Sequence, residues 1–103
     1  MMKKHLIRIL IACGSGIATS SIAADVVEEV AHKEKIRVII TKGTIPQIQT
    51  KQHDVDLVLT TARYNKSVEK PFLCVMGFVS GVGEEDQREQ LAEMLRKIRS
   101  GEL

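Results

Sequence analysis

The sequence predicts an α/β fold with one four-stranded parallel sheet, strand order 2-1-3-4, flanked by helices. Short apolar runs rich in β-branched residues alternate with segments of helical period, and the links between them are brief. The length of 103 residues suits one domain, expected to span residues 1–103. The order 2-1-3-4 places the first strand centrally, beside the change in strand order where such sheets bind ligands.

The first expected strand covers residues 6–12, an apolar run interrupted only by Arg8. Cys13 follows, and then a stretch of glycines and small hydroxyl residues. Beyond it, Ile22, Val26 and Val30 recur every four residues, which predicts a helix that ends near His32. Ser20 or Ser21 is the expected N-cap, so the strand and the helix are joined by a loop that begins at Cys13.

Three further strands are expected at residues 37–41, 57–61 and 72–75. Lys42-Gly43 is expected to turn the chain after the second strand, before a short helix that starts at Thr44-Ile45-Pro46. The last helix is expected from Glu84 to Arg99, acidic in its first turn and basic in its last, as the helix dipole favours. Residues 62–70 are expected to be irregular, and residues 76–83 to form a loop or bent segment punctuated by glycine.

Composition excludes several classes of function. Aromatic residues make up 3% of the chain and tryptophan is absent, which argues against platforms that stack on single-stranded nucleic acid. The net charge of +2 is too small to indicate nucleic acid or a membrane surface. Two cysteines without a CxxC pattern, and no signal peptide, favour a cytoplasmic protein without direct membrane insertion. The histidines show no metal spacing with either cysteine, so we expect no metal and no cofactor.

Cys13 is the candidate reactive residue. A thiol at the end of a buried strand, before a glycine-rich loop and a helix N-terminus, lies where backbone N–H groups can hold an anion. The same helix dipole favours the thiolate. The alternatives are a buried structural cysteine for Cys13 and a tight turn without a ligand for Gly14 and Gly16.

The segment Cys13-Gly14-Ser15-Gly16-Ile17-Ala18-Thr19-Ser20 resembles the phosphocysteine loop of the IIB components of the bacterial sugar phosphotransferase system. Two later stretches, Thr60-Thr61-Ala62-Arg63 and Phe78-Val79-Ser80-Gly81-Val82-Gly83, resemble its galactitol-type branch. The resemblance implies a phosphotransferase subunit that takes a phosphoryl group from a histidine of IIA and passes it to a sugar in the membrane component IIC.

The resemblance also assigns the site. It implies that Cys13 carries the phosphoryl group and that the loop residues bind it: Gly14, Ser15, Gly16, Ile17, Ala18, Thr19 and Ser20. It further implies a cytoplasmic protein that associates peripherally with the membrane subunit IIC. Arg63 is a possible accessory cation, with a solvated surface arginine as the alternative reading. Cys74 lies inside a strand pattern and is interpreted as a core residue.

Two other functions stay open at this point. Low-molecular-weight tyrosine phosphatases and arsenate reductases of that fold use a Cys-x5-Arg loop, whereas the sixth residue after Cys13 is Thr19. No Asp-Pro dipeptide supplies their usual acid, so the sequence favours a carrier over a hydrolase. A regulatory docking domain with the IIB fold is the second alternative, and Cys13 argues against it because docking has no use for a thiol in an anion-binding loop.

Overall fold

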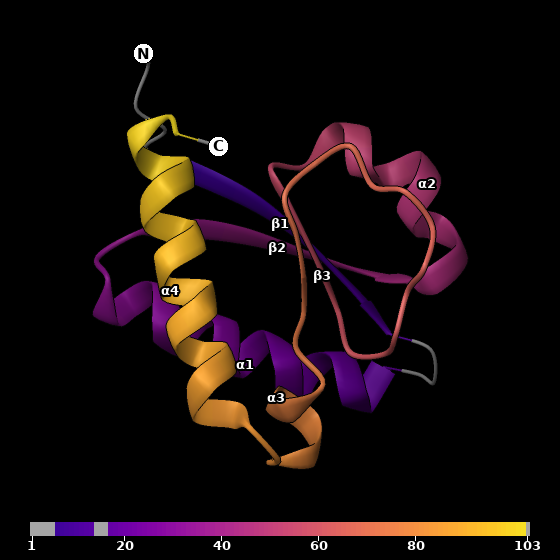
Figure 1. Cartoon of the computed structure of the whole chain (residues 1–103), viewed down its shortest axis with the longest axis horizontal. Coiled ribbons are helices and arrows are strands. Elements are labelled where there is room, and N and C mark those ends of the chain that lie inside the picture. The colour runs from indigo at the N-terminus through magenta and orange to yellow at the C-terminus, as the bar shows by residue number, and fades with distance from the viewer. Residues whose placement is uncertain (1–5, 14–16, 103) are drawn as a thin grey trace.

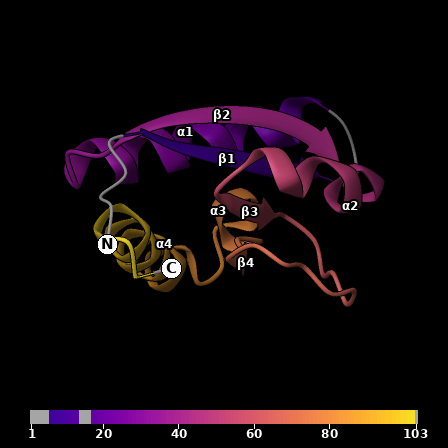
Figure 2. The same cartoon turned by 90° about the horizontal axis from the view of Figure 1, so that it is seen from above.

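Four parallel strands form the centre of the computed structural model, which describes residues 6–13 and 17–102, with the backbone alone at 17–20. The strands are β1 (Leu6–Cys13), β2 (Arg37–Thr44), β3 (Leu57–Thr60) and β4 (Phe72–Cys74). They follow one another in the order β2-β1-β3-β4 (Figures 1 and 2). This confirms the predicted fold class and strand order.

The strands all run in one direction, so their carboxyl ends meet at one edge of the sheet. Cys13 pairs with Thr44 of β2, while its neighbour Ala12 pairs with Thr60 of β3. Thr60 in turn pairs with Cys74 of β4. The register therefore places the ends of all four strands in one row, with Cys13 near its middle.

One face of the sheet is covered by α1 (Ile17–Lys33), α3 (Gly77–Ser80) and α4 (Glu84–Ser100) (Figure 1). The alternate residues of β1 that face these helices, Ile7, Ile9, Ile11 and Cys13, belong to a single buried apolar cluster. The other face packs a smaller cluster, to which Leu10 and Ala12 belong, against α2 (Ile48–Lys51) and its flanking helical turns, η1 (Ile45–Gln47) and η2 (Gln52–Asp54). The central strand is thus buried on both faces, as its apolar run predicts.

The second strand is longer than predicted, because β2 continues through Lys42 and Gly43 to Thr44. Pairing with β1 extends to the end of both strands, and this tertiary contact outweighs the local turn preference of Lys-Gly. A Cβ on Gly43 would lie 3.1 Å from Leu10 Cδ1 and 3.0 Å from Gln47 Oε1. Glycine is needed here for a close approach of neighbouring side chains and not for a turn.

Helix α1 also differs from prediction, since it begins at Ile17, ahead of the expected caps Ser20 and Ser21. Ser21 lies inside the helix, where its hydroxyl accepts a hydrogen bond from Lys42. The expected bent segment at residues 76–83 contains the short helix α3, which ends at Gly81 with a φ of 83°. No helix among the described residues has the length and apolarity needed to cross a membrane.

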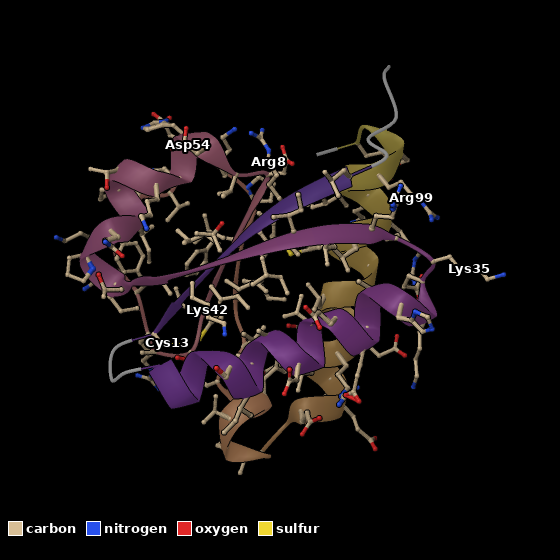
Figure 3. The ribbon with its side chains drawn as sticks, turned by 180° about the vertical axis from the view of Figure 1, so that it is seen from behind. Arg8, Cys13, Lys35, Lys42, Asp54 and Arg99 are labelled. Atoms are coloured by element: carbon tan, nitrogen blue, oxygen red, sulfur yellow. The ribbon has the colours of Figure 1, made fainter. Side chains whose placement is uncertain are left out.

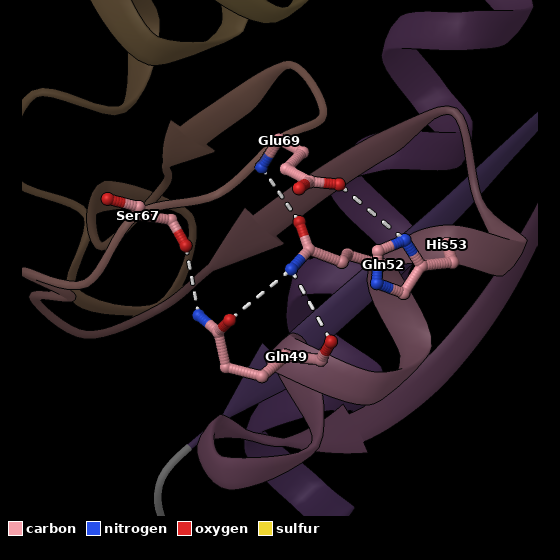
Figure 4. A network of polar contacts seen from close by, with 5 residues as sticks. All are labelled: Gln49, Gln52, His53, Ser67 and Glu69. Carbon is pink, nitrogen blue, oxygen red and sulfur yellow. Dashed lines mark hydrogen bonds and ion pairs between the residues drawn. The ribbon is translucent and has the colours of Figure 1, made fainter.

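The segment between β3 and β4 has no regular structure, as predicted, but polar contacts fasten it to α2 (Figure 4). The buried Gln52 accepts a hydrogen bond from the Glu69 N–H at 2.8 Å. Gln49 donates to the Ser67 carbonyl at 2.9 Å and to the Tyr64 hydroxyl at 2.6 Å. We call this set of contacts the glutamine clamp; it gives the loop a fixed path from the end of β3.

Candidate functional site

Cys13 is the last residue of β1 and has 4% of its surface exposed. Hydrogen-bonded strands flank β1 on both sides, which fixes the backbone that carries the thiol. Its side chain joins the apolar cluster under α1, α3 and α4, together with Phe78 from the segment after β4. The thiol is therefore held at the carboxyl edge of the sheet, on the face covered by α1.

The N-terminus of α1 lies four residues beyond Cys13, since the helix begins at Ile17. The N–H groups in the first turn of a helix have no partner within the helix and carry the positive end of its dipole. The backbone of Ile17, Ala18, Thr19 and Ser20 therefore presents N–H groups that can hold an anion, four residues after the thiol. The predicted loop residues Gly14, Ser15 and Gly16 lie outside the described residues, as do the side chains of 17–20.

The loop after β3 starts beside the site, because the Thr61 N–H donates to the carbonyl of Ala12 at 3.2 Å. Arg63 follows two residues later and is exposed. It lines a shallow pocket of about 550 Å³ with Tyr64, Asn65, Phe72 and Cys74. The structure thus joins the start of this loop to the Cys13 edge and places the Arg63 side chain in a pocket at the β4 side of the sheet.

Cys74 is half-buried, so the prediction of a core position is wrong. It ends β4, an edge strand, where one side of the residue faces the pocket with Arg63. Its thiol lies 3.6 Å from the carbonyl of Ala62 and donates a weak hydrogen bond to it. Sequence periodicity alone does not separate an edge strand from a central one.

Lys42 is a cation near the site that the sequence reading missed. Its ammonium group donates to the Ser21 hydroxyl at 3.1 Å, over the N-terminal part of α1. Figure 3 labels Lys42 and Cys13 at the same end of the molecule, far from Lys35 and Arg99. The sequence predicts a turn at Lys42-Gly43 and therefore does not place Lys42 on a strand. The observed parallel register pairs Thr44 with Cys13, which puts Lys42, two residues earlier, on the face covered by α1.

A wider cleft, of about 1000 Å³, lies between α1 and α4. Its lining is rich in charged residues, among them Glu34, Glu84, Glu85 and Arg88, and includes none of the predicted site residues. Within the described part of the chain, no group of three or more His, Cys, Asp or Glu side chains is arranged to hold a metal ion. The thiol at the end of β1, four residues before the start of α1, is an arrangement that can do chemistry.

A thiol at the end of the central strand, followed by a helix N-terminus, is an arrangement in which an α/β protein can hold an anion at a cysteine. Residues 8–93 match the family model of the phosphotransferase system lactose/cellobiose-specific IIB subunit. The chain belongs to this family of IIB subunits, and it is a phosphotransferase that acts as a phosphocarrier. Subunits of this family work, in general, with IIA and IIC partners.

Individual relatives agree with the family match. The galactitol-specific EIIB components of Escherichia coli O157:H7 and of Shigella flexneri are each 34% identical over 90 residues, which is 86% of this chain and 96% of theirs. A solved structure, the cellobiose-specific phosphotransferase IIB component of Borrelia burgdorferi, has the same fold, with a TM-score of 0.56. It is 18% identical, and the match covers 91% of this chain and 94% of that one.

Proposed function

We propose that Cys13 accepts a phosphoryl group from a phosphohistidine of IIA and passes it to a sugar or polyol bound in the membrane subunit IIC. The observation that supports this most directly is the thiol at the end of β1, followed four residues later by the start of α1. An anion attached to this sulfur would lie beside unpaired helix N–H groups, which stabilise negative charge.

The two steps balance without a further reactant. In the first, the thiolate attacks phosphorus, the S–P bond forms and the N–P bond to the IIA histidine breaks. In the second, a hydroxyl of the sugar attacks, the O–P bond forms and the S–P bond breaks. The hydroxyl proton is released to water, and the Cys13 thiolate is regenerated. Each step asks the protein mainly for in-line positioning and for stabilisation of charge on the phosphoryl oxygens. The amides of Ile17 to Thr19 can supply that stabilisation.

An apolar surface at the same edge supports docking of both partners. Met76, Val79 and Val82 are exposed, with 42%, 38% and 79% of their surface accessible. They belong to the segment after β4, which leaves the sheet at the edge where Cys13 lies. Exposed apolar side chains grouped in one segment are typical of a protein interaction site.

Galactitol or a related polyol is the substrate we propose, on the strength of the galactitol-specific relatives. We also propose a cytoplasmic protein that associates peripherally with the membrane through IIC. The test measures galactitol phosphorylation by membranes that contain a galactitol IIC, with and without this protein, and so tests both the substrate and the use of IIC. If this protein stimulated phosphorylation of a different sugar equally, in membranes that contain the IIC for that sugar, the assignment of galactitol would be contradicted.

The test of the site uses labelled phosphoenolpyruvate, the general phosphotransferase proteins and a galactitol-type IIA. We expect the wild type and Cys74→Ser to become labelled, and Cys13→Ser to remain unlabelled. Cys74→Ser is a matched control because its thiol lies at the same edge of the sheet. Normal labelling of Cys13→Ser would refute the proposed site, and steady hydrolysis of p-nitrophenyl phosphate without partners would instead indicate a phosphatase.

A further inference from the structure

Lys42 lies on the same face of the sheet as Cys13. In the parallel register Lys42 pairs with Ile11, and Thr44 pairs with Cys13. Paired residues of parallel strands point to the same face, and residues two apart on a strand share it. Both Ile11 and Cys13 belong to the cluster under α1, so Lys42 extends toward that helix, where its ammonium reaches Ser21 at 3.1 Å.

The charges around this end of α1 conflict when no anion is bound. Cations are favourable at the C-terminus of a helix and unfavourable near its N-terminus, where the dipole is already positive. The first turn of α1 contains no acidic residue, and none of the ion pairs found within residues 6–13 and 17–102 includes Lys42. Among the described residues, a cation thus lies over the N-terminal part of α1, and neither the first turn of that helix nor an ion pair of Lys42 supplies a carboxylate.

The other long helix shows the ordinary arrangement. Helix α4 has Glu84, Glu85 and Asp86 in its first turn and Lys97 and Arg99 in its last. The two helices have equal length, but the first turn of α4 is acidic and the first turn of α1 has no acidic residue. A local electrostatic conflict that α4 avoids is typical of a site that awaits a charged group.

We propose that the Lys42 ammonium is the counter-charge of the phosphoryl group on Cys13, an inference that rests on the phosphocarrier function proposed above. The dianion would neutralise both the ammonium and the end of α1. Lys42 would then partly replace the guanidinium that phosphatase loops carry and that Thr19 lacks. A single ammonium is a point charge without the bidentate geometry of arginine, which suits a group that must leave again.

Ser21 connects Lys42 to the helix. Its oxygen accepts the hydrogen bond from the ammonium, which leaves the hydroxyl proton available to another acceptor. The bond also holds the flexible lysine side chain over α1, although the side chain is exposed. Lys42 therefore keeps its place at the site when the phosphoryl group is absent.

The test compares Lys42→Met with wild type in the phosphoryl exchange between phospho-IIA and this protein. We expect the equilibrium constant for phosphoryl gain to fall about fivefold, which is the size of the attraction between two unit charges about 4 Å apart in water. Lys42→Arg should restore most of it. The thermal midpoint of unphosphorylated Lys42→Met should equal or exceed that of wild type, because the conflict is relieved. Raising the salt concentration should lower the wild-type constant toward that of the variant.

Lys33→Met is the matched control, since it removes the same charge from the other end of α1 and should leave the exchange constant unchanged. An exchange constant for Lys42→Met equal to that of wild type would overturn the role of Lys42 while leaving the phosphocarrier function intact. A loss of stability in unphosphorylated Lys42→Met would mean that the residue is structural. A wild-type protein that gains no phosphoryl group would overturn both proposals.

Discussion

Thr19 occupies the position at which Cys-x5-Arg phosphatase loops have an arginine, and this difference should affect the lifetime of a phosphoryl group on Cys13. A threonine can offer its own N–H and one hydroxyl, whereas a guanidinium binds phosphate oxygens bidentately. In this structure Thr19 lies in the first turn of α1, so its N–H belongs to the unpaired set at the helix N-terminus.

Thr19→Arg should therefore slow onward transfer. We expect the phosphorylated variant to return its phosphoryl group to excess IIA about tenfold more slowly, the size of one additional hydrogen bond between charged groups. Rapid-quench measurement of the label on each protein gives the rate, and circular dichroism checks that the helix is intact. A folded variant that transfers at the wild-type rate would show that charge at this position does not control the lifetime.

The sequence reveals Cys13 more readily than Lys42, for a physical reason. A cysteine followed by glycines and a helix is a local pattern, readable within a dozen residues. Lys42 reaches the site only because β2 pairs with β1 in a particular register, and that pairing joins residues about thirty positions apart. Cys74 was misplaced for the same reason, since the position of its strand at the sheet edge is a property of the whole topology.

At the scale of elements, the glutamine clamp determines the path of the loop that carries Arg63 (Figure 4). Gln52 is 3% exposed, and its side chain both donates to Gln49 and accepts from the Glu69 N–H. Without the Gln52 side chain, the Glu69 N–H would lose its acceptor. The Gln52 amide is therefore one of two amide groups that hold the loop, beside that of Gln49.

Gln52→Leu should lower the free energy of unfolding by about 0.5–1.5 kcal/mol, the usual net contribution of a hydrogen bond, because the Glu69 N–H loses its acceptor. Urea denaturation measures this loss, and hydrogen exchange should show faster exchange at residues 62–70. Gln90→Leu, an exposed position on α4, is the control and should change neither quantity. Unaltered exchange in the loop of a folded Gln52→Leu variant would mean that other contacts hold the loop.

The boundaries of elements were predicted less well than their order. Apolar periodicity gave four strands and two long helices, because a face that must be buried leaves a repeating pattern. The ends of β2 and α1 depend on contacts between elements: β2 continues as long as β1 is beside it, and α1 starts three residues before Ser20. Such contacts are absent from any local window of sequence.

At the scale of the molecule, α1 and α4 are joined by both apolar packing and ion pairs. Leu95 is fully buried in the cluster between the sheet and the helices. Arg88 lies 2.7 Å from Glu84 and 3.2 Å from Glu29, which connects α4 to α1. The hydrogen bond to Glu84 raises the pKa of Arg88 above its already high value, so the arginine stays charged throughout the working range.

Apolar packing should dominate this junction. Leu95→Ala should lower the free energy of unfolding by about 2–5 kcal/mol, the usual cost of a cavity in a core. Arg88→Met should cost about 0.5 kcal/mol or less, because solvent and salt screen ion pairs at the surface. Urea denaturation at low and high salt separates the two: the Leu95 effect should persist in salt and the Arg88 effect should fade. Equal losses in both variants would contradict this ranking.

The placement of Cys13 restricts how a carrier of the proposed kind can operate. Cys13 pairs with Thr44 of β2 and its neighbour Ala12 pairs with Thr60 of β3, so the sheet holds the backbone that carries the sulfur and the sulfur does not move from a donor to an acceptor. The donor and the acceptor must therefore bind at the same site one after the other, and the first partner has to dissociate before the second can bind. A partner that dissociated slowly would block phosphoryl transfer to or from the other partner. The rate of phosphoryl transfer is then limited by the dissociation rate of each complex, which favours two short-lived complexes over one strong one.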